Sequence, residues 1–242
     1  MISRYISRLI LSETPILYYS QFSPPARAAY MVAKTLGLRL DLKNVNIFTK
    51  EYVTPDLMQA NPQHTIPTLI DGNYHLWDSH AIAGYLVGQY GQDDSLYPKN
   101  PKKRAHVDQK LHFDTEQLFP KIYDTIYPIL FRGRTEIPLI ARKRVERTYD
   151  LLERFLSRSP WLAGTDLTIA DICCISSIST LDYVIPIRKK YTPHLYDYMQ
   201  RCSHLPHYEE TIQRGVDQLG SKIQEHLITS YIKHYSIYKN LD

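Results

Sequence analysis

The chain has 242 residues and a mass of 28.3 kDa, which is enough for one large domain or two small ones with a real core. With 29 Lys and Arg against 25 Asp and Glu, its formal net charge of +4 is too small for a dedicated nucleic-acid-binding protein. Hydrophobic residues make up 43% and charged residues 22%, which is typical of a globular protein and not of a disordered one. No apolar run reaches the roughly 18 residues that a membrane span requires. We therefore expect a soluble protein of two domains.

Cysteine usage and the first residues bear on location. Cys173 and Cys174 are adjacent, Cys202 makes the number odd, and neither a CxxC motif nor metal-ligand spacing is present. This pattern favours a reducing compartment and gives no support to a metal site. Residues 1–14 form an N-terminal extension with two arginines before any acidic residue and an apolar helical face. We expect a frayed extension of a cytoplasmic protein, with an amphipathic transit peptide as the alternative.

The first predicted domain, residues 15–91, alternates strands and helices. Gly37 is a natural stop for the first helix, and an Asp-Gly turn joins the last two strands as a hairpin. The order is β-α-β-α-β-β-α. The elements are a strand over 16–19, a helix over 24–36, an extended run over 39–47, a short helix over 55–60, strands over 67–70 and 74–77, and a helix over 79–90.

A polar, proline-containing stretch, residues 92–102, is the predicted linker to an all-α domain over 103–242. Pro120 and Pro128 predict bends in its first long helix. The apolar face of that helix comprises Val107, Leu111, Leu118, Ile122, Ile126 and Leu130, and a second face comprises Ile140, Val145, Tyr149, Leu152 and Leu156. A further helix is expected over 191–201. The last 30 residues or so read as helical, either covering a cleft or trailing in solvent.

Thr168 and Asp171 have the spacing of a helix capping box, in which Asp replaces the usual Glu. The helix that follows is nearly all apolar, with apolar residues around its circumference, so it should be buried on all sides. We expect its role to be structural.

Ser23 follows the first strand and opens the first helix, with two prolines after it. A serine there is a favoured N-cap, and its function could end with that cap. Alternatively, its hydroxyl and the positive end of the helix dipole could together stabilise an anion held above the helix.

Two other short segments could bind a ligand. A cis bond at Ile66-Pro67 would expose the backbone of Ile66 for pairing with an extended peptide, although a trans proline could simply begin an edge strand. Ser79 is a candidate N-cap whose helix amides could bind a carboxylate, while Asp78 could pair with a neighbouring ammonium. His64 is close enough in sequence to reach a second carboxylate, although a lone histidine is more often a surface residue.

Taken together, these segments resemble the cytosolic glutathione transferases, and specifically the insect delta/epsilon group, with epsilon favoured. The similarity covers residues 15–208. It is carried by YYSQFSPPARAAYMVAKTLGL, NPQHTIPTLIDGNYHLWDSHAIAGYLVGQYG, DDSLYP, LHFD and LAGTDLTIAD. The resemblance implies an α/β, thioredoxin-like N-terminal domain, an all-helical C-terminal bundle and a homodimer. It also implies glutathione as co-substrate, with no metal.

The resemblance implies a role for individual residues. Ser23 matches the serine that stabilises the glutathione thiolate, and Pro67 matches the family's cis-proline. Ile66 matches the residue whose backbone pairs with the cysteinyl unit. The remaining glutathione-binding positions are Tyr52, His64, Thr65, Asp78, Ser79 and His80.

This chain departs from the family pattern at three positions. Tyr52 stands where epsilon members commonly have histidine, and Tyr123 stands where many have arginine. Asp78 stands where the family usually has glutamate, so the carboxylate is kept on a shorter side chain. We expect weaker glutathione binding and a more aromatic electrophile pocket than is usual in the family.

The chemistry explains what such a site must do. A free thiol with a pKa of ~8.5 is only about three per cent thiolate at pH 7, and the thiolate is the nucleophile. Lowering that pKa by ~2 would supply ~2.7 kcal/mol. Tyr18 and Tyr19 are rival hydroxyl donors, since other transferase classes use a tyrosine near the end of the first strand.

An apolar second substrate is expected to bind on the first long bundle helix. The expected pocket wall comprises Phe119, Ile122, Tyr123, Ile126, Tyr127 and Phe131, which fit core packing equally well. We thus predict an enzyme that conjugates glutathione to hydrophobic electrophiles, with peroxide reduction or dehydrochlorination as options. The alternatives are a carrier of apolar ligands such as steroids and a transferase-like interaction module.

Overall fold

The structure is a computed structural model that describes residues 14–49 and 54–239, with side chains described up to residue 228. Its first half has the predicted order of elements. These are β1 (Ile16–Tyr19), α2 (Pro24–Thr35), β2 (Asp41–Asn44), α3 (Pro55–Ala60), β3 (Thr68–Asp71), β4 (Tyr74–Trp77) and α4 (Ser79–Tyr90). The extended run predicted over 39–47 contains a strand of only four residues.

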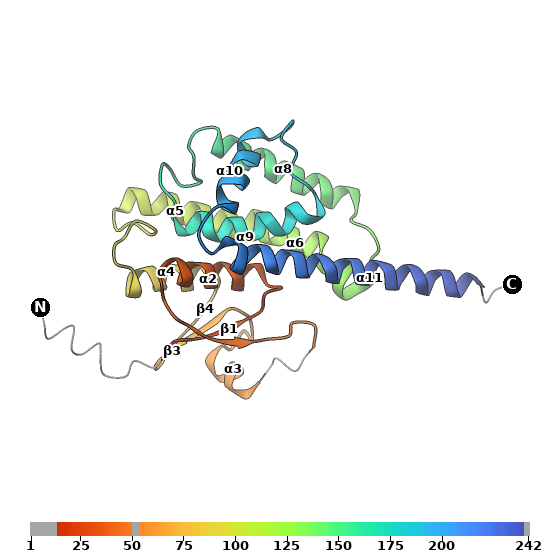
Figure 1. Ribbon diagram of the computed structural model, residues 1–242, viewed down its shortest axis with the longest axis horizontal. Helices are drawn as coiled ribbons and strands as arrows, with labels where there is room; N and C mark the ends of the chain where they lie inside the picture. The colour runs from red at the N-terminus through yellow and green to blue at the C-terminus, as the bar shows by residue number, and fades with distance from the viewer. Residues whose placement is uncertain (1–13, 50–53, 240–242) are drawn as a thin grey trace, which may run out of the picture.

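The four strands form one mixed sheet in the order β2-β1-β3-β4. β1 pairs with β2 in parallel, while β3 is antiparallel to both β1 and β4. Helices α2 and α4 lie between this sheet and the helical half of the molecule (Figure 1). Thr68 is the register partner of both Tyr18 and Trp77. The chain segments that follow β1, precede β3 and follow β4 therefore lie at the same end of the strands, which we call the sheet edge.

The first long helical stretch of the second half is broken, as its prolines predict. It consists of α5 (Pro101–Phe113), a π-helical turn η2 (Asp114–Leu118), α6 (Phe119–Thr125) and α7 (Tyr127–Arg132). α5 begins at Pro101, within the stretch predicted as linker. Asn100 explains this start, because its Oδ1 accepts hydrogen bonds from the amides of Lys102 and Lys103 at 3.1 and 3.2 Å.

The rest of the bundle consists of α8 (Leu139–Leu156), α9 (Ile169–Val184), α10 (Pro193–Ser203), a second π-helical turn η3 (Glu209–Gln213) and α11 (Arg214–Lys239). The prediction for Ile140 was wrong, because its side chain is 61% exposed. The buried stripe of α8 begins at Ala141 instead and continues through Val145. Leu219 and Ile223 of α11 are buried, whereas the last turns of this helix extend past the rest of the bundle (Figure 1).

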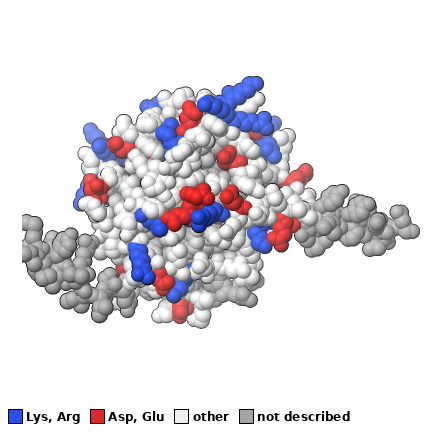
Figure 2. All heavy atoms as spheres, viewed as in Figure 1, with Lys and Arg blue, Asp and Glu red and all other residues white. Residues whose placement is uncertain are grey.

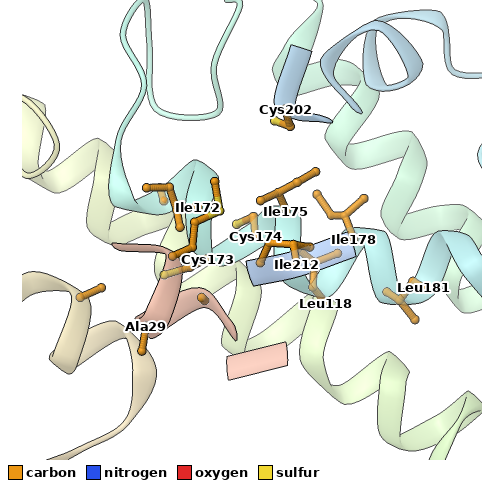
Figure 3. Packing of buried hydrophobic residues seen from close by; sticks show 14 of the residues in the cluster. Ala29, Leu118, Ile172, Cys173, Cys174, Ile175, Ile178, Leu181, Cys202 and Ile212 are labelled. Carbon is orange, nitrogen blue, oxygen red and sulfur yellow. The ribbon is translucent and has the colours of Figure 1, made fainter. Parts of the chain in front are cut away.

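Helix α9 lies at the centre of the protein. Every residue from Ile169 to Leu181 is buried, which confirms the prediction from its all-round apolar sequence. Figure 3 shows its isoleucines and cysteines among side chains of other elements, including Ala29 of α2, Leu118 of η2 and Cys202 of α10. The predicted capping box is also confirmed, with the amide of Thr168 2.9 Å from Asp171 Oδ2. Because α9 also packs on α2, it joins the bundle to the α/β half.

The helices and the surface charge bear on whether the chain could cross a membrane or bind a highly charged partner. Among the described helices, none is long and apolar enough to cross a membrane. Figure 2 shows basic and acidic side chains interspersed on the face in view.

Candidate active site

A cavity of about 250 Å³ lies between the sheet edge and the helical bundle. Its floor comes from the loop after β1 and from residues 64–66, and its wall comes from α6, α7 and Leu219 of α11. All six residues expected in an electrophile pocket line it: Phe119, Ile122, Tyr123, Ile126, Tyr127 and Phe131. Most of the other lining residues are apolar as well. The cavity therefore suits a hydrophobic molecule, with a few polar groups at one side.

Ser23 lines this cavity and is the N-cap of α2. Its Oγ accepts a hydrogen bond from the amide of Ala26 at 3.4 Å, which is long for such a bond. No described residue accepts the hydroxyl hydrogen of Ser23, so this hydrogen can be donated to a bound group. The first turn of α2 has no acidic side chain, so the positive end of the helix dipole is not neutralised there.

The two rival tyrosines lie elsewhere. Neither Tyr18 nor Tyr19 lines the cavity. Tyr19 is buried with its ring against Tyr30, and burial raises the pKa of its hydroxyl to about 12. Burial and the negative charge of Asp56 raise the pKa of Tyr18. Of the three candidate hydroxyls, Ser23 is therefore the one that lines the cavity.

The loop before β3 brings His64, Thr65 and Ile66 to the cavity. The bond between Ile66 and Pro67 is cis, as expected. Ile66 precedes the ladder between β1 and β3, which begins at Thr68. Its amide and carbonyl therefore lie outside that ladder, beside the cavity.

Sequence reasoning missed the residue that holds this loop. The side chain of Asn61 is fully buried and donates to the carbonyl and hydroxyl oxygens of Thr65, both at 3.1 Å, and to Thr68 Oγ1 at 2.9 Å. Its Oδ1 accepts from the amide of Gln63 at 2.8 Å. His64, inside this loop, has a φ of +53°. The signal in the sequence was an amide residue at the start of NPQHTIP, but its partners are set only by the folded loop.

The cap of α4 differs from the prediction. Asp78, and not Ser79, is the N-cap, with a φ of +72°. Its Oδ1 accepts from the amides of His80 and Ala81 at 2.9 and 3.1 Å. The protein's own carboxylate therefore occupies the two amides that the sequence offered to a ligand. Ser79, the first residue of α4, is buried.

His80 does not line the cavity. Its ring contacts Asp114 and Thr115 of η2, with Nε2 2.9 Å from Asp114 Oδ2 and Nδ1 3.2 Å from Thr115 Oγ1. Burial disfavours the imidazolium, but the hydrogen bond and the charge of Asp114 outweigh it, so the pKa of His80 is raised. Because both ring nitrogens of His80 contact residues of η2, the structure gives no support to the prediction that its side chain contacts glutathione. Tyr52, the other departure from the family pattern in this domain, lies outside the described residues.

The wall of the cavity is an aromatic ladder. Phe119, Tyr123, Tyr127 and Phe131 follow one another at i, i+4 spacing, with successive ring centroids 5.3, 5.3 and 4.6 Å apart. Phe48, from the loop after β2, stacks on Phe131 at 5.7 Å and so reaches across from the α/β half. Five further residues line the cavity beyond those predicted from the sequence: Phe22, Pro24, Ile47, Leu130 and Leu219.

Metal chemistry has no support in the described part of the chain, where no cluster of His, Cys, Asp and Glu could hold an ion. The three cysteines are buried free thiols. Burial raises the pKa of Cys173 and Cys174 well above the ordinary value.

Comparisons with known proteins point in the same direction as this geometry. Residues 17–94 match the family model "Glutathione S-transferase, N-terminal domain", and residues 114–206 match "Glutathione S-transferase, C-terminal domain". Glutathione S-transferase 1 of Manduca sexta is 45% identical over 203 residues, which are 83% of this chain and 93% of that protein.

Solved structures agree with these matches. An epsilon-class glutathione S-transferase from the housefly, Musca domestica, superposes with a TM-score of 0.85 at 38% identity, covering 88% of this chain and 98% of the other. A glutathione transferase homologue from Drosophila mojavensis with bound glutathione gives 0.83 at 39% identity, covering 88% and 97%.

Proposed function

The chain belongs to the glutathione S-transferases, with glutathione as its co-substrate, and we propose that Ser23 activates the glutathione thiol for attack on hydrophobic electrophiles. The single observation that carries this proposal is the position of Ser23. Its side chain lines the apolar cavity at the N-terminus of α2, where it is the N-cap of that helix.

Ser23 acts as a hydrogen-bond donor to the thiolate. Its Oγ accepts from the amide of Ala26, which leaves its hydroxyl hydrogen available for donation to the sulfur. The helix dipole adds a positive potential at the same point. A thiol pKa lowered by ~2 corresponds to ~2.7 kcal/mol and makes the thiolate a major species at neutral pH. The serine itself does not attack.

The tripeptide lies along the sheet edge where the three segments meet. The amide and carbonyl of Ile66, next to cis-Pro67, pair with the cysteinyl unit as a short added strand. Asp78 and Ser79 hold the γ-glutamyl end. Because Asp78 Oδ1 is engaged in capping, Oδ2 is the oxygen that meets the ammonium. His64 and Thr65, with Tyr52, serve the glycyl end.

The electrophile occupies the aromatic ladder opposite Ser23. Its wall offers rings and aliphatic side chains, so apolar and aromatic electrophiles gain most from burial there. Conjugation is the proposed main reaction: the glutathione thiolate forms a C–S bond to the electrophilic carbon, and the leaving group, chloride in the case of a chloronitrobenzene, departs with the bonding electron pair.

A thiolate absorbance titration with bound glutathione tests the role of Ser23. Ser23→Ala should raise the pKa of the bound thiol by 1 to 2 and lower kcat/KM for a chloronitrobenzene about 10- to 100-fold at neutral pH. Glutathione affinity, measured by calorimetry, should change much less. Tyr19→Phe is the matched control and should leave the thiol pKa unchanged. The opposite pattern, in which the tyrosine change raises the pKa and the serine change does not, would reject the assignment.

Two properties of the assembly and its location are also proposed. We propose a homodimer, as the family resemblance implies, which sedimentation at micromolar concentration would test. A chain that sediments as a monomer across that range would reject it.

We also propose a cytoplasmic location, which the three free thiols suit. Residues 1–13 of the extension lie outside the described residues. Fusing residues 1–14 to a fluorescent reporter should give a diffuse cytosolic signal, whereas import into an organelle would contradict this location.

A further inference from the structure

Arg27 of α2 is a fully buried arginine that no described ion pair includes. Burial lowers the pKa of its guanidinium to about 10, so it remains charged at neutral pH. A buried charge without a carboxylate is costly unless hydrogen bonds satisfy it. The hydrogen bonds of Arg27 go to neutral oxygens. Its role therefore follows from the positions of the groups that it binds.

The hydrogen bonds of Arg27 join the turn before Ser23 to helix α9. Nη1 donates to the carbonyl oxygen of Gln21 at 3.0 Å. On the other side, Nε donates to Ser176 Oγ at 3.5 Å and Nη2 to the Ser176 carbonyl at 3.4 Å. Nη2 also donates to Thr180 Oγ1. One side chain thus links the loop after β1 to the bundle.

Ser176 of α9 binds the same segment directly, on the C-terminal side of Ser23. Its hydroxyl donates to the carbonyl oxygen of Pro24 at 2.7 Å. The carbonyls of Gln21 and Pro24 flank Phe22 and Ser23, so both ends of this segment are tied to one site on α9. These bonds also give a structural reason for the buried hydroxyl of Ser176.

Helix α11 closes the third side of this arrangement. A Cβ on Gly215 would lie 2.4 Å from the carbonyl oxygen of Gln21 and 2.6 Å from Arg27 Cδ. Only glycine fits at this distance. The carbonyl of Gln21 therefore lies confined between Arg27 of α2 and Gly215 of α11.

We propose that Arg27 and Ser176 are positioning residues that fix the segment from Gln21 to Pro24 and so aim the Ser23 hydroxyl at the glutathione sulfur. This inference rests on the role proposed above for Ser23. A hydrogen bond to an anion weakens steeply with distance and misalignment. A shift of the turn by a fraction of an ångström therefore raises the thiol pKa without removing any group that touches the substrate. The bundle, through α9, thus controls a residue of the other domain.

The test compares two serines of α9 whose hydroxyls bind different partners: one binds the segment around Ser23, and the other binds only groups of the bundle. Ser179 is buried like Ser176, but its hydroxyl donates to the Ile175 carbonyl at 2.7 Å and contacts Tyr208 Oη at 2.9 Å, within the bundle. Ser176→Ala should raise the pKa of bound glutathione by about 1, and kcat/KM at neutral pH should fall about tenfold. Ser179→Ala, the matched control, should leave both unchanged even if it lowers the melting temperature.

Arg27→Lys gives a second and independent measurement. It keeps a positive charge but cannot span Gln21 and Ser176 with a planar fork, so it should raise the thiol pKa in the same direction as Ser176→Ala. If Arg27→Lys does not fold, the pair of serine variants still decides. A wild-type thiol pKa in Ser176→Ala, or an equal shift in Ser179→Ala, overturns the positioning role.

Ser23→Ala, measured alongside, separates failure of this inference from failure of the proposed function. If Ser23→Ala raises the thiol pKa and Ser176→Ala does not, only the positioning role is wrong. If Ser23→Ala itself leaves the thiol pKa unchanged, the activating role of Ser23 is wrong, and the positioning role is wrong with it.

Discussion

His80 of α4 and Asp114 of η2 meet across the boundary between the two domains, with Nε2 2.9 Å from Oδ2 and both side chains largely buried. Asp114 Oδ1 has no hydrogen-bond partner among the described residues. The pair therefore depends on one short contact, and its strength depends on whether the histidine is protonated.

This contact predicts a pH-dependent stability. Because the pKa of His80 is raised in the folded state, its contribution is complete below the unfolded pKa of ~6.5 and is lost as pH rises through the folded value. His80→Gln should lower the free energy of unfolding by about 2 kcal/mol near pH 5.5 and by less near pH 8. Urea denaturation at both pH values measures this. His75→Gln, at an exposed position of β4, is the control. An equal loss at both pH values would contradict the prediction.

Asn61 should be needed for both stability and glutathione binding. Asn61→Ala removes the hydrogen bonds of this buried amide to Thr65, Thr68 and Gln63, and because Thr68 is buried while the other two partners are exposed, it should cost about 2 kcal/mol. It also frees the loop that carries Thr65 and Ile66. Calorimetry should show glutathione affinity reduced about tenfold. Gln63→Ala, at a neighbouring exposed amide side chain, should change neither, and a wild-type affinity in Asn61→Ala would reject the role.

Phe131 should determine the size of electrophile that the cavity accepts. Its ring lies at the end of the aromatic ladder, between Tyr127 and Phe48. Phe131→Ala removes part of the wall, so KM for a small aromatic electrophile should rise about 5- to 30-fold, corresponding to about 1 to 2 kcal/mol of lost burial. The ratio of kcat/KM for a bulky over a small electrophile should rise. Leu139→Ala, at an exposed site outside the cavity, is the control, and an unchanged ratio would refute this prediction.

The cap of α9 should be worth more than an ordinary surface cap. Asp171 accepts from the amides of Leu162 and Thr168 at 2.8 and 2.9 Å in a buried site. Asp171→Ala should lower the free energy of unfolding by about 3 kcal/mol and Thr168→Ala by about 1 kcal/mol. Thermal or urea unfolding measures both. Asn100→Ala, at the exposed cap of α5, should cost less than Asp171→Ala, and the reverse order would show that burial does not set the cost.

The local features of the fold were predictable because they depend on residues close in the chain. Three of them rest on contacts between residues a few positions apart: the hairpin at Gly72, the start of α2 after Ser23 and the cap at Thr168. The same holds for the breaks near Pro120 and Pro128. The aromatic ladder was also accessible from i, i+4 spacing, since Tyr123 and Tyr127 share a face on any helix.

Other features depended on how the elements pack. The sequence could not show that His80 turns toward Asp114, because that direction requires η2 to lie beside the start of α4. The cap at Asp78 needed a left-handed backbone that propensity does not predict. Asn61 has an ordinary sequence context, and only the folded loop gives it buried partners.

The sequence by itself determined the order of elements, the family and the residue that opens α2, because each is encoded locally or in motifs of fixed spacing. Only the tertiary structure decided that a charge on α2 and a hydroxyl on α9 hold the turn around that residue. Arg27 and Ser176 are 149 positions apart, and no pattern within either helix reveals a contact that arises when the two domains pack.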